Sequence, residues 1–197
     1  MNDVFELIGN GIIFSWDPEE ISKDFKVISN KGNNVITLPN KEPHWQYFDS
    51  GIYFSRNLNH AFPSLCKEIL KTLMVVQNNV KALPNKSSMM KLFADHKLNI
   101  DRILLVKVKS GQSVNLHFDS TRDYAINIGL KNSNTCLTDI YSGDKVEHLL
   151  INEKNTKHTF QMNDGDAYLI ATCQPHAVRS LTSINDNVDR YIISYCL

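Results

Sequence analysis

The chain has 197 residues, and its 21 Lys+Arg balance 21 Asp+Glu, so the formal net charge is +0. This length predicts one domain, with a core that can bury about 70% of the unfolded surface. The zero balance argues against a dedicated nucleic-acid binder and against a polybasic membrane-surface protein, because both classes carry a basic excess.

The expected location is the cytoplasm. No apolar run in the sequence is long enough to span a bilayer. The segment Met1–Glu6 has neither the basic start nor the apolar stretch of a secretory signal. The cysteines are irregularly spaced and form no Cys-x-x-Cys pair, which predicts reduced thiols rather than a disulfide framework or a Cys-rich zinc site. They are Cys66, Cys136, Cys173 and Cys196.

The first half of the chain mixes extended and helical patterns. Residues 46–55 are rich in aromatic side chains around a glycine, which indicates extended structure on both sides of a turn. Residues 63–80 predict a helix, because Pro63 suits a first turn and apolar residues recur at helical spacing. Those apolar residues are Leu65, Ile69, Leu73 and Val76. Residues 87–96 predict a shorter helix, and residues 29–42 a loop.

The pattern of the second half predicts β structure throughout. Short strand patterns follow one another, separated by turns that contain Gly, Asn, Asp and Ser. The predicted strands are 102–109, 113–119, 124–130, 135–141, 146–151, 157–162, 166–172, 176–182 and 190–197. So many short strands predict a sandwich or jelly roll. We therefore expect residues 1–101 to form a supporting region of the same globular unit, and residues 102–197 to form its core.

A metal-binding pattern lies in this second half. His117 and Asp119 fall two residues apart on the predicted strand 113–119, so period-2 geometry places both side chains on one face. His176 begins a later predicted strand, which a jelly roll brings close in space. Two histidines and one carboxylate form the facial triad typical of non-haem Fe(II), with coordination positions left open.

Arg190 adds a second kind of group. It begins the last predicted strand, and Ile192 and Ser194 share its face. A guanidinium forms a planar fork that suits the far carboxylate of a dicarboxylate, and the Ser194 hydroxyl supplies a further contact.

Together these residues resemble the Fe(II)- and 2-oxoglutarate-dependent dioxygenases, in particular their prolyl-hydroxylase-like subgroup. The similarity covers residues 102–197 and includes a glycine six residues before the first histidine. Its motifs are Gly111, His117-Phe118-Asp119, His176-Ala177-Val178 and Arg190-Tyr191-Ile192-Ile193-Ser194. The chain departs from the subgroup at Val108, where a tyrosine is common, in a longer segment between His176 and Arg190, and in a compact segment after Asp119.

The resemblance implies a double-stranded β-helix (jelly roll) with N-terminal supporting helices, mainly β and α+β overall. It implies that His117, Asp119 and His176 hold Fe(II), that Arg190 anchors 2-oxoglutarate, and that O2 is the oxidant. No catalytic residue is needed beyond the metal ligands. The implied reaction hydroxylates a C–H bond and releases succinate and CO2. Its substrate would be a prolyl or other amino-acid side chain of a peptide or protein, or a small molecule.

Strand parity suggests further residues around the site. Asn127 lies opposite the apolar face of its strand and Val178 shares a face with His176, so both are expected to contact the co-substrate. Asn115 shares a face with His117, and Arg122 follows the metal ligands, so these two are candidate substrate contacts. The alternative for Asn127 and Arg122 is a solvated surface position.

Two other functions remain open from the sequence. One is a cupin-type metalloprotein that does not use 2-oxoglutarate, although Arg190 would then have no role. The other is a non-catalytic jelly-roll binding module, in which the triad occurs by chance.

Overall fold

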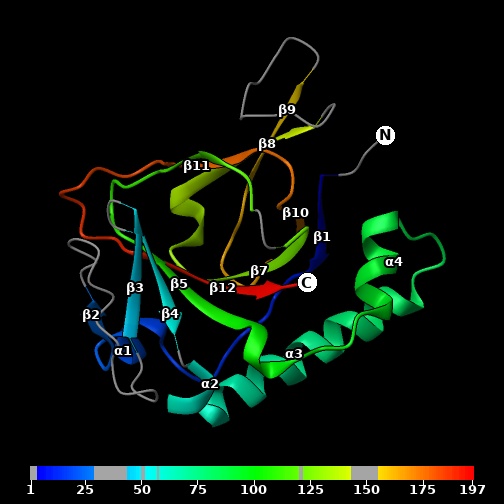
Figure 1. Cartoon of the computed structure of the whole chain (residues 1–197), viewed down its shortest axis with the longest axis horizontal. Helices are drawn as coiled ribbons and strands as arrows, with labels where there is room; N and C mark the ends of the chain where they lie inside the picture. The colour runs from blue at the N-terminus through cyan, green and yellow to red at the C-terminus, as the bar shows by residue number, and fades with distance from the viewer. Residues whose placement is uncertain (1–3, 29–43, 50–51, 57, 120–121, 143–154) are drawn as a thin grey trace.

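The computed structural model describes residues 4–28, 44–49, 52–56, 58–119, 122–142 and 155–197 (Figure 1). Its strands are β1 (Phe5–Gly9), β2 (Lys26–Ile28), β3 (His44–Asp49), β4 (Ile52–Arg56), β5 (Ile103–Val108), β6 (Val114–His117), β7 (Tyr124–Lys131), β8 (Cys136–Ser142), β9 (Thr156–Gln161), β10 (Ala167–Ala171), β11 (His176–Ser180) and β12 (Arg190–Cys196). Its α-helices are α1 (Pro18–Ser22), α2 (Leu58–Ala61), α3 (Pro63–Ala82) and α4 (Ser88–Asp95), with 3-10 turns at Ile100–Arg102 and Ser133–Thr135.

The second half of the chain folds into two facing antiparallel sheets. Strands β5, β7, β10 and β12 belong to the larger sheet, and β6, β8, β9 and β11 form the smaller sheet in the order β6-β11-β8-β9. The chain therefore passes from one sheet to the other at every connection except that between β8 and β9, which pair with each other. This topology is the predicted double-stranded β-helix, and the mainly β fold class is confirmed.

Strands from the first half extend the larger sheet at both edges. Its order is β1-β10-β7-β12-β5-β4-β3-β2, so β1 forms one edge and the β3–β4 pair lies beside β5. The extended structure predicted around residues 46–55 is confirmed by β3 and β4. The short elements β1, β2, α1 and α2 were not predicted. The predicted loop 29–42 and the predicted strand 146–151 lie outside the described residues.

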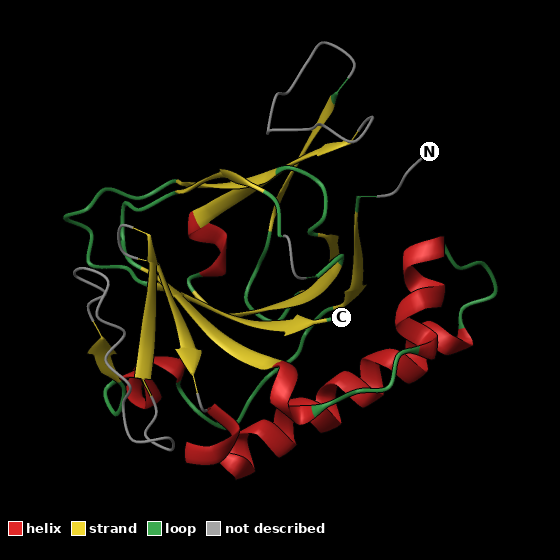
Figure 2. Cartoon of the chain, viewed as in Figure 1, coloured by secondary structure: helices red, strands yellow, loops and turns green. Residues whose placement is uncertain are grey.

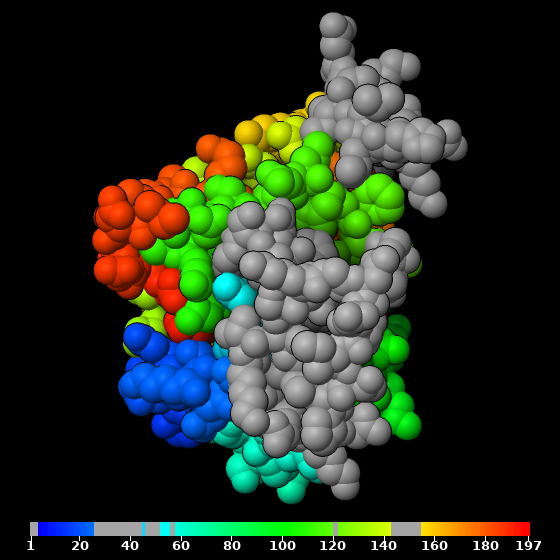
Figure 3. Space-filling model, turned by 60° about the vertical axis from the view of Figure 1, so that its left-hand side comes forward, coloured from blue at the N-terminus to red at the C-terminus, as the bar shows by residue number. Residues whose placement is uncertain are grey.

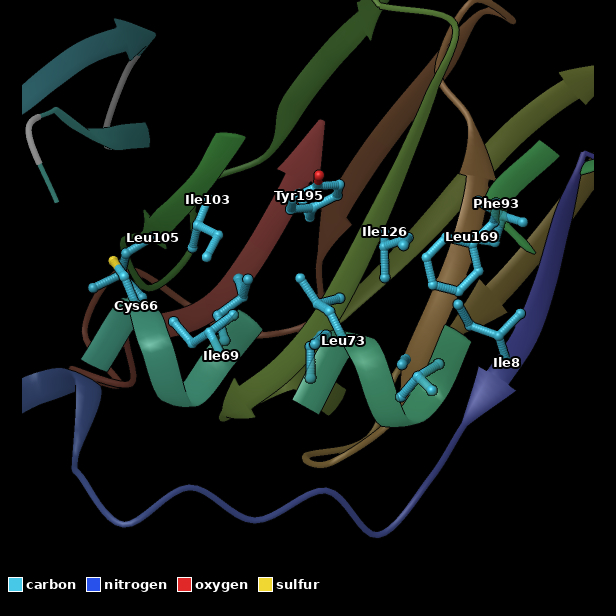
Figure 4. Packing of buried hydrophobic residues seen from close by; sticks show 14 of the residues in the cluster. Ile8, Cys66, Ile69, Leu73, Phe93, Ile103, Leu105, Ile126, Leu169 and Tyr195 are labelled. Carbon is cyan, nitrogen blue, oxygen red and sulfur yellow. The ribbon is translucent and has the colours of Figure 1, made fainter. Parts of the chain in front are cut away.

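Helices α3 and α4 cover the face of the larger sheet that points away from the smaller one (Figure 2). Figure 4 shows Cys66, Ile69 and Leu73 of α3 directed at apolar side chains of the sheet, among them Ile126 and Leu169. Helix α3 is amphipathic, because Leu73 is fully buried while its neighbour Met74 is 50% exposed. Both predicted helices are confirmed within two residues.

A second apolar cluster fills the space between the two sheets. It includes Val106, Val108, Ile140, Ile170 and Ile192. Alternation along β12 sends Ile193 and Tyr195 to the helix-covered side and Ile192 to this interior. The same alternation carries Arg190 and Ser194 into the interior, where both are buried.

Gly111 lies in the connection between β5 and β6, at a position that requires glycine. Its φ is +72°, and an added Cβ would collide with the backbone nitrogen of Ile184. Ile184 belongs to the segment joining β11 to β12, the orange-red segment on the surface above the blue N-terminal part in Figure 3. The close approach of these two connections forms one end of the jelly roll. Among the described residues, no helix is both long and apolar enough to cross a bilayer.

Candidate metal centre

The two candidate histidine ligands are brought together by one strand pair. His117 is the last residue of β6 and His176 the first residue of β11, and the antiparallel register pairs them directly. Their ring centroids are 4.2 Å apart. The point where one strand of the smaller sheet ends is thus the point where its neighbour begins.

Backbone carbonyls hold both imidazoles in the same tautomer. His117 Nδ1 lies 2.8 Å from the carbonyl oxygen of Asn115, and His176 Nδ1 lies 2.9 Å from that of Gln174. A carbonyl oxygen can only accept, so each Nδ1 carries a hydrogen, and Nε2 is the ring nitrogen that a metal would use. This is the usual second contact of a histidine that binds a metal through Nε2.

Asp119 completes the group from a position just beyond β6. The strand ends at His117, earlier than predicted, and the Asp119 amide instead donates to the carbonyl oxygen of Thr172, 2.9 Å away. One ligand atom from each of His117, Asp119 and His176 lies within 4.8 Å of the others. Small side-chain rotations would therefore let all three reach a single ion. Among the described residues, this is the one such group of three or more potential ligands.

The electrostatic environment favours the ligand form of His176. Burial, with a smaller contribution from nearby His117, lowers the pKa of His176 to about 4. The imidazole is therefore neutral at pH 7 and its Nε2 lone pair is available. Two imidazole nitrogens and one carboxylate oxygen are a donor set suited to a divalent first-row metal.

Arg122 occupies a more central position than the sequence suggested. Its Nε donates to Asp119 Oδ2 at 2.6 Å, and its Nη1 donates to Ser194 Oγ at 3.3 Å and to Cys196 Sγ at 2.8 Å. The three-residue spacing from Asp119 was the available sequence signal, because it keeps the two charged groups near each other along the chain. The Ser194 hydroxyl, expected beside the co-substrate, is thus already an acceptor for Arg122.

Arg190 is a buried cation without an ion pair among the described residues. The residue is 4% exposed, and its Nε is buried and makes no hydrogen bond. Burial lowers the pKa of the guanidinium, while Cys136 and, more weakly, Asp164 favour its charged form. An unsatisfied buried donor on an arginine fits a carboxylate ligand, which would accept two parallel hydrogen bonds.

One side-chain atom of Asn127 is also unsatisfied. The register of β7 and β12 pairs Asn127 with Ser194, and Asn127 Oδ1 is buried without a hydrogen-bond partner among the described residues. The alternation of side chains along the strand predicts that Asn127 faces away from Ile126 and Ile128. Those two residues pack on the helix-covered side of the sheet. Asn127 and Arg190 are therefore two unsatisfied polar residues within the larger sheet.

The remaining candidates lie nearer the smaller sheet. Val178 is half-buried and pairs with Val114 and Thr138 on either side. Asn115 is exposed, and its backbone carbonyl is the partner of His117. Arg179, one residue from Val178, lies on the opposite face of the sheet from His176 and ion-pairs there with Asp139.

No family model and no curated protein matches the chain. Among solved structures, the non-heme alpha ketoglutarate dependent epimerase SnoN from nogalamycin biosynthesis is 8% identical, with a TM-score of 0.48 over 76% of this chain and 64% of that one. Oxalate oxidase in complex with glycolate is 14% identical, with a TM-score of 0.36 over 47% of this chain and 39% of that one. Vicilin from hazelnut (Corylus avellana) is 13% identical, with a TM-score of 0.34 over 48% and 23%. These similarities are too low to indicate a function for this chain.

Proposed function

We propose that the chain is an Fe(II)- and 2-oxoglutarate-dependent dioxygenase that hydroxylates a C–H bond of its substrate. One observation carries the proposal. A group of two imidazoles and one carboxylate lies in a jelly roll whose interior holds Arg190, which is buried with an unsatisfied Nε and no ion pair among the described residues. Neither the triad nor the buried Arg190 alone requires this function. A dicarboxylate that chelates a metal would contact both.

The metal ligands would be His117 Nε2, His176 Nε2 and one oxygen of Asp119. Hydrogen bonds to backbone carbonyls fix both rings before a metal arrives, so little ordering is left for the binding step. Three protein ligands leave open positions for a chelating co-substrate and O2. When bound, Fe(II), 2-oxoglutarate and O2 supply the oxidation of the C–H bond, with release of succinate and CO2.

Arg190 would bind the carboxylate of 2-oxoglutarate that lies farthest from the metal. A buried guanidinium without a counter-ion is costly, and a carboxylate ligand removes that cost by forming a two-point contact. Asn127 presents an amide group to the same interior, and its Nδ2 would donate to an oxygen of the ligand. Its unsatisfied Oδ1 can only accept, so 2-oxoglutarate, which has no donor, does not supply a partner for that atom. Val178, on the His176 side, would contact the carbon chain.

For the substrate, we propose an amino-acid side chain, free or within a peptide or protein, with proline as the first candidate. The support is the similarity of Gly111, His176-Ala177-Val178 and Arg190–Ser194 to the prolyl-hydroxylase-like motifs. Asn115 is exposed beside His117 and is the candidate contact at the mouth of the site. A small molecule of another class is the alternative, and we propose a cytoplasmic location.

The test is an anaerobic titration of the folded protein with Fe(II), followed by 2-oxoglutarate. We expect a visible charge-transfer band that requires both components and disappears in Asp119→Ala. His158→Ala is the matched control, because His158 lies on β9 and contacts Ser142 rather than the triad. A folded wild-type protein that gives no band contradicts the proposal. Iron binding without a response to 2-oxoglutarate would instead support the cupin-type metalloprotein.

A further inference from the structure

We infer that Arg122 is a positioning residue that orients Asp119 for the metal and fixes this ligand to β12. The inference rests on the proposed metal site, and it gives Arg122 a role different from the substrate contact suggested by the sequence. Asp119 needs such support, because it lies beyond the end of β6 and outside the paired strands of the smaller sheet.

The contact between the two side chains is close and mostly shielded from water. Arg122 Nε lies 2.6 Å from Asp119 Oδ2, and the two side chains are 16% and 18% exposed. A charge-assisted hydrogen bond of this kind, largely removed from solvent, restricts carboxylate rotation more than an exposed ion pair does. It also occupies Oδ2, which leaves Oδ1 as the free oxygen for a metal.

The other end of the guanidinium is attached to the larger sheet. Nη1 donates to Ser194 Oγ and Cys196 Sγ, two residues of β12 on the same side of that strand. The Arg122 carbonyl accepts from Thr172 Oγ1 at 3.3 Å, and the Thr172 carbonyl accepts from the Asp119 amide. Because the guanidinium is rigid and planar, it transmits the position of β12 to the Asp119 carboxylate.

Two effects of Arg122 on metal affinity oppose each other. Its positive charge disfavours a nearby divalent ion, whereas its hydrogen bond holds Asp119 ready for that ion. Removing an outer-shell partner of a metal ligand typically weakens metal binding about 10- to 100-fold. We therefore expect orientation to outweigh repulsion at this site.

The test compares Co(II) binding to wild type, Arg122→Gln and Arg122→Lys by calorimetry and by the visible absorption of the bound Co(II). We expect Arg122→Gln to bind Co(II) about 10- to 100-fold more weakly. Its spectrum should change, because Asp119 becomes free to bind through both oxygens. Arg122→Lys should recover part of the affinity, since an ammonium can contact Asp119 but cannot also reach both β12 partners. Arg179→Gln is the matched control, because it breaks another Arg–Asp pair on the outer face of the smaller sheet.

Wild-type affinity and spectrum in Arg122→Gln, or tighter binding, would overturn the inference while leaving the proposed metal site intact. A folded wild type that fails to bind Co(II) would overturn the metal site and the inference together. Thermal unfolding of the metal-free proteins shows which variants are folded. If Arg122→Gln does not fold, Arg122→Lys and Ser194→Ala provide the test, because each weakens the link between Arg122 and β12. Unchanged Co(II) affinity in both variants would overturn the inference.

Discussion

His176, the first residue of β11, stands directly opposite His117, the last residue of β6, with ring centroids 4.2 Å apart. Each ring donates its Nδ1 hydrogen to a backbone carbonyl, so Nε2 is the nitrogen through which both imidazoles would bind one ion. The pairing follows from the antiparallel register of the smaller sheet. The candidate metal site is therefore built into the strand pairing of the jelly roll.

Replacing His176 should remove metal binding more completely than an outer-shell change. We expect His176→Ala to weaken Co(II) binding by more than about 100-fold, because a ligand is lost rather than merely reoriented. Calorimetric titration measures this effect, with His158→Ala as the control that keeps wild-type affinity. Equal affinities in the two variants would show that His176 is not a ligand.

Gly111→Ala should destabilise the fold through backbone strain and collision together. The positive φ alone costs an alanine about 1 kcal/mol, and the added Cβ also meets the backbone of Ile184, so a loss of about 2–4 kcal/mol is expected. Gly11→Ala is the matched control: its φ is +65°, but no atom lies within 4 Å of an added Cβ. Urea unfolding should show a clearly larger loss at Gly111, and similar losses would argue against the close approach.

Asp139 should make stability depend on acid pH. Burial raises its pKa, but hydrogen bonds from Arg179, Thr159 and Lys157 outweigh burial and hold the pKa at about 2, below the ordinary 3.8. A lowered carboxyl pKa gives stability above pH 4 that is lost as the pH falls toward 2. Both cations are about half-exposed, so we expect about 1–2 kcal/mol.

The corresponding measurement is urea unfolding of wild type and Asp139→Asn at several pH values between 7 and 2. Asp139→Asn should be less stable at pH 7, and the difference should shrink as the pH approaches 2. A difference that stays constant over this range would show that the ionised carboxylate is not its source.

Leu73→Ala tests whether residues 1–101 and the jelly roll unfold as one unit. Leu73 is fully buried between α3 and the larger sheet, so the cavity should cost about 2–5 kcal/mol. Its exposed neighbour provides the control, Met74→Ala, for which we expect little change. Circular dichroism and tryptophan fluorescence should report one coincident transition, shifted equally for both signals. Two separate transitions would contradict a single unit.

The periodicity of the sequence was enough to predict most of the jelly roll. Strands such as β5, β7 and β12 carry continuous or alternating apolar residues bounded by clear turns, and α3 shows a strong helical stripe. By contrast, β2 has only three residues, and β1 (Phe5–Gly9) shows no regular alternation of apolar and polar residues, so neither strand stands out in the sequence. Their pairing depends on edges that only the folded sheet offers.

The site was predictable to a similar extent. His117, Asp119 and His176 could be chosen by residue type and spacing, and Arg190 by its place on the last strand. Only the three-residue spacing pointed to the ion pair between Arg122 and Asp119, and the contacts of Arg122 with Ser194 and Cys196 of β12 depend on tertiary structure that this spacing does not show. The buried, unsatisfied state of Asn127 Oδ1 likewise appears only in the fold.

In the proposed function, the metal triad and Arg190 hold the two ends of one ligand. Its most direct test measures binding of 2-oxoglutarate and of 2-oxopentanoate, which lacks the far carboxylate, to anaerobic Fe(II)-loaded wild type and Arg190→Met. We predict that Arg190→Met weakens 2-oxoglutarate binding at least about 10-fold, as expected for losing a charge-assisted contact, and leaves 2-oxopentanoate unaffected. Equal weakening of both ligands, or of neither, in a folded variant would contradict the account.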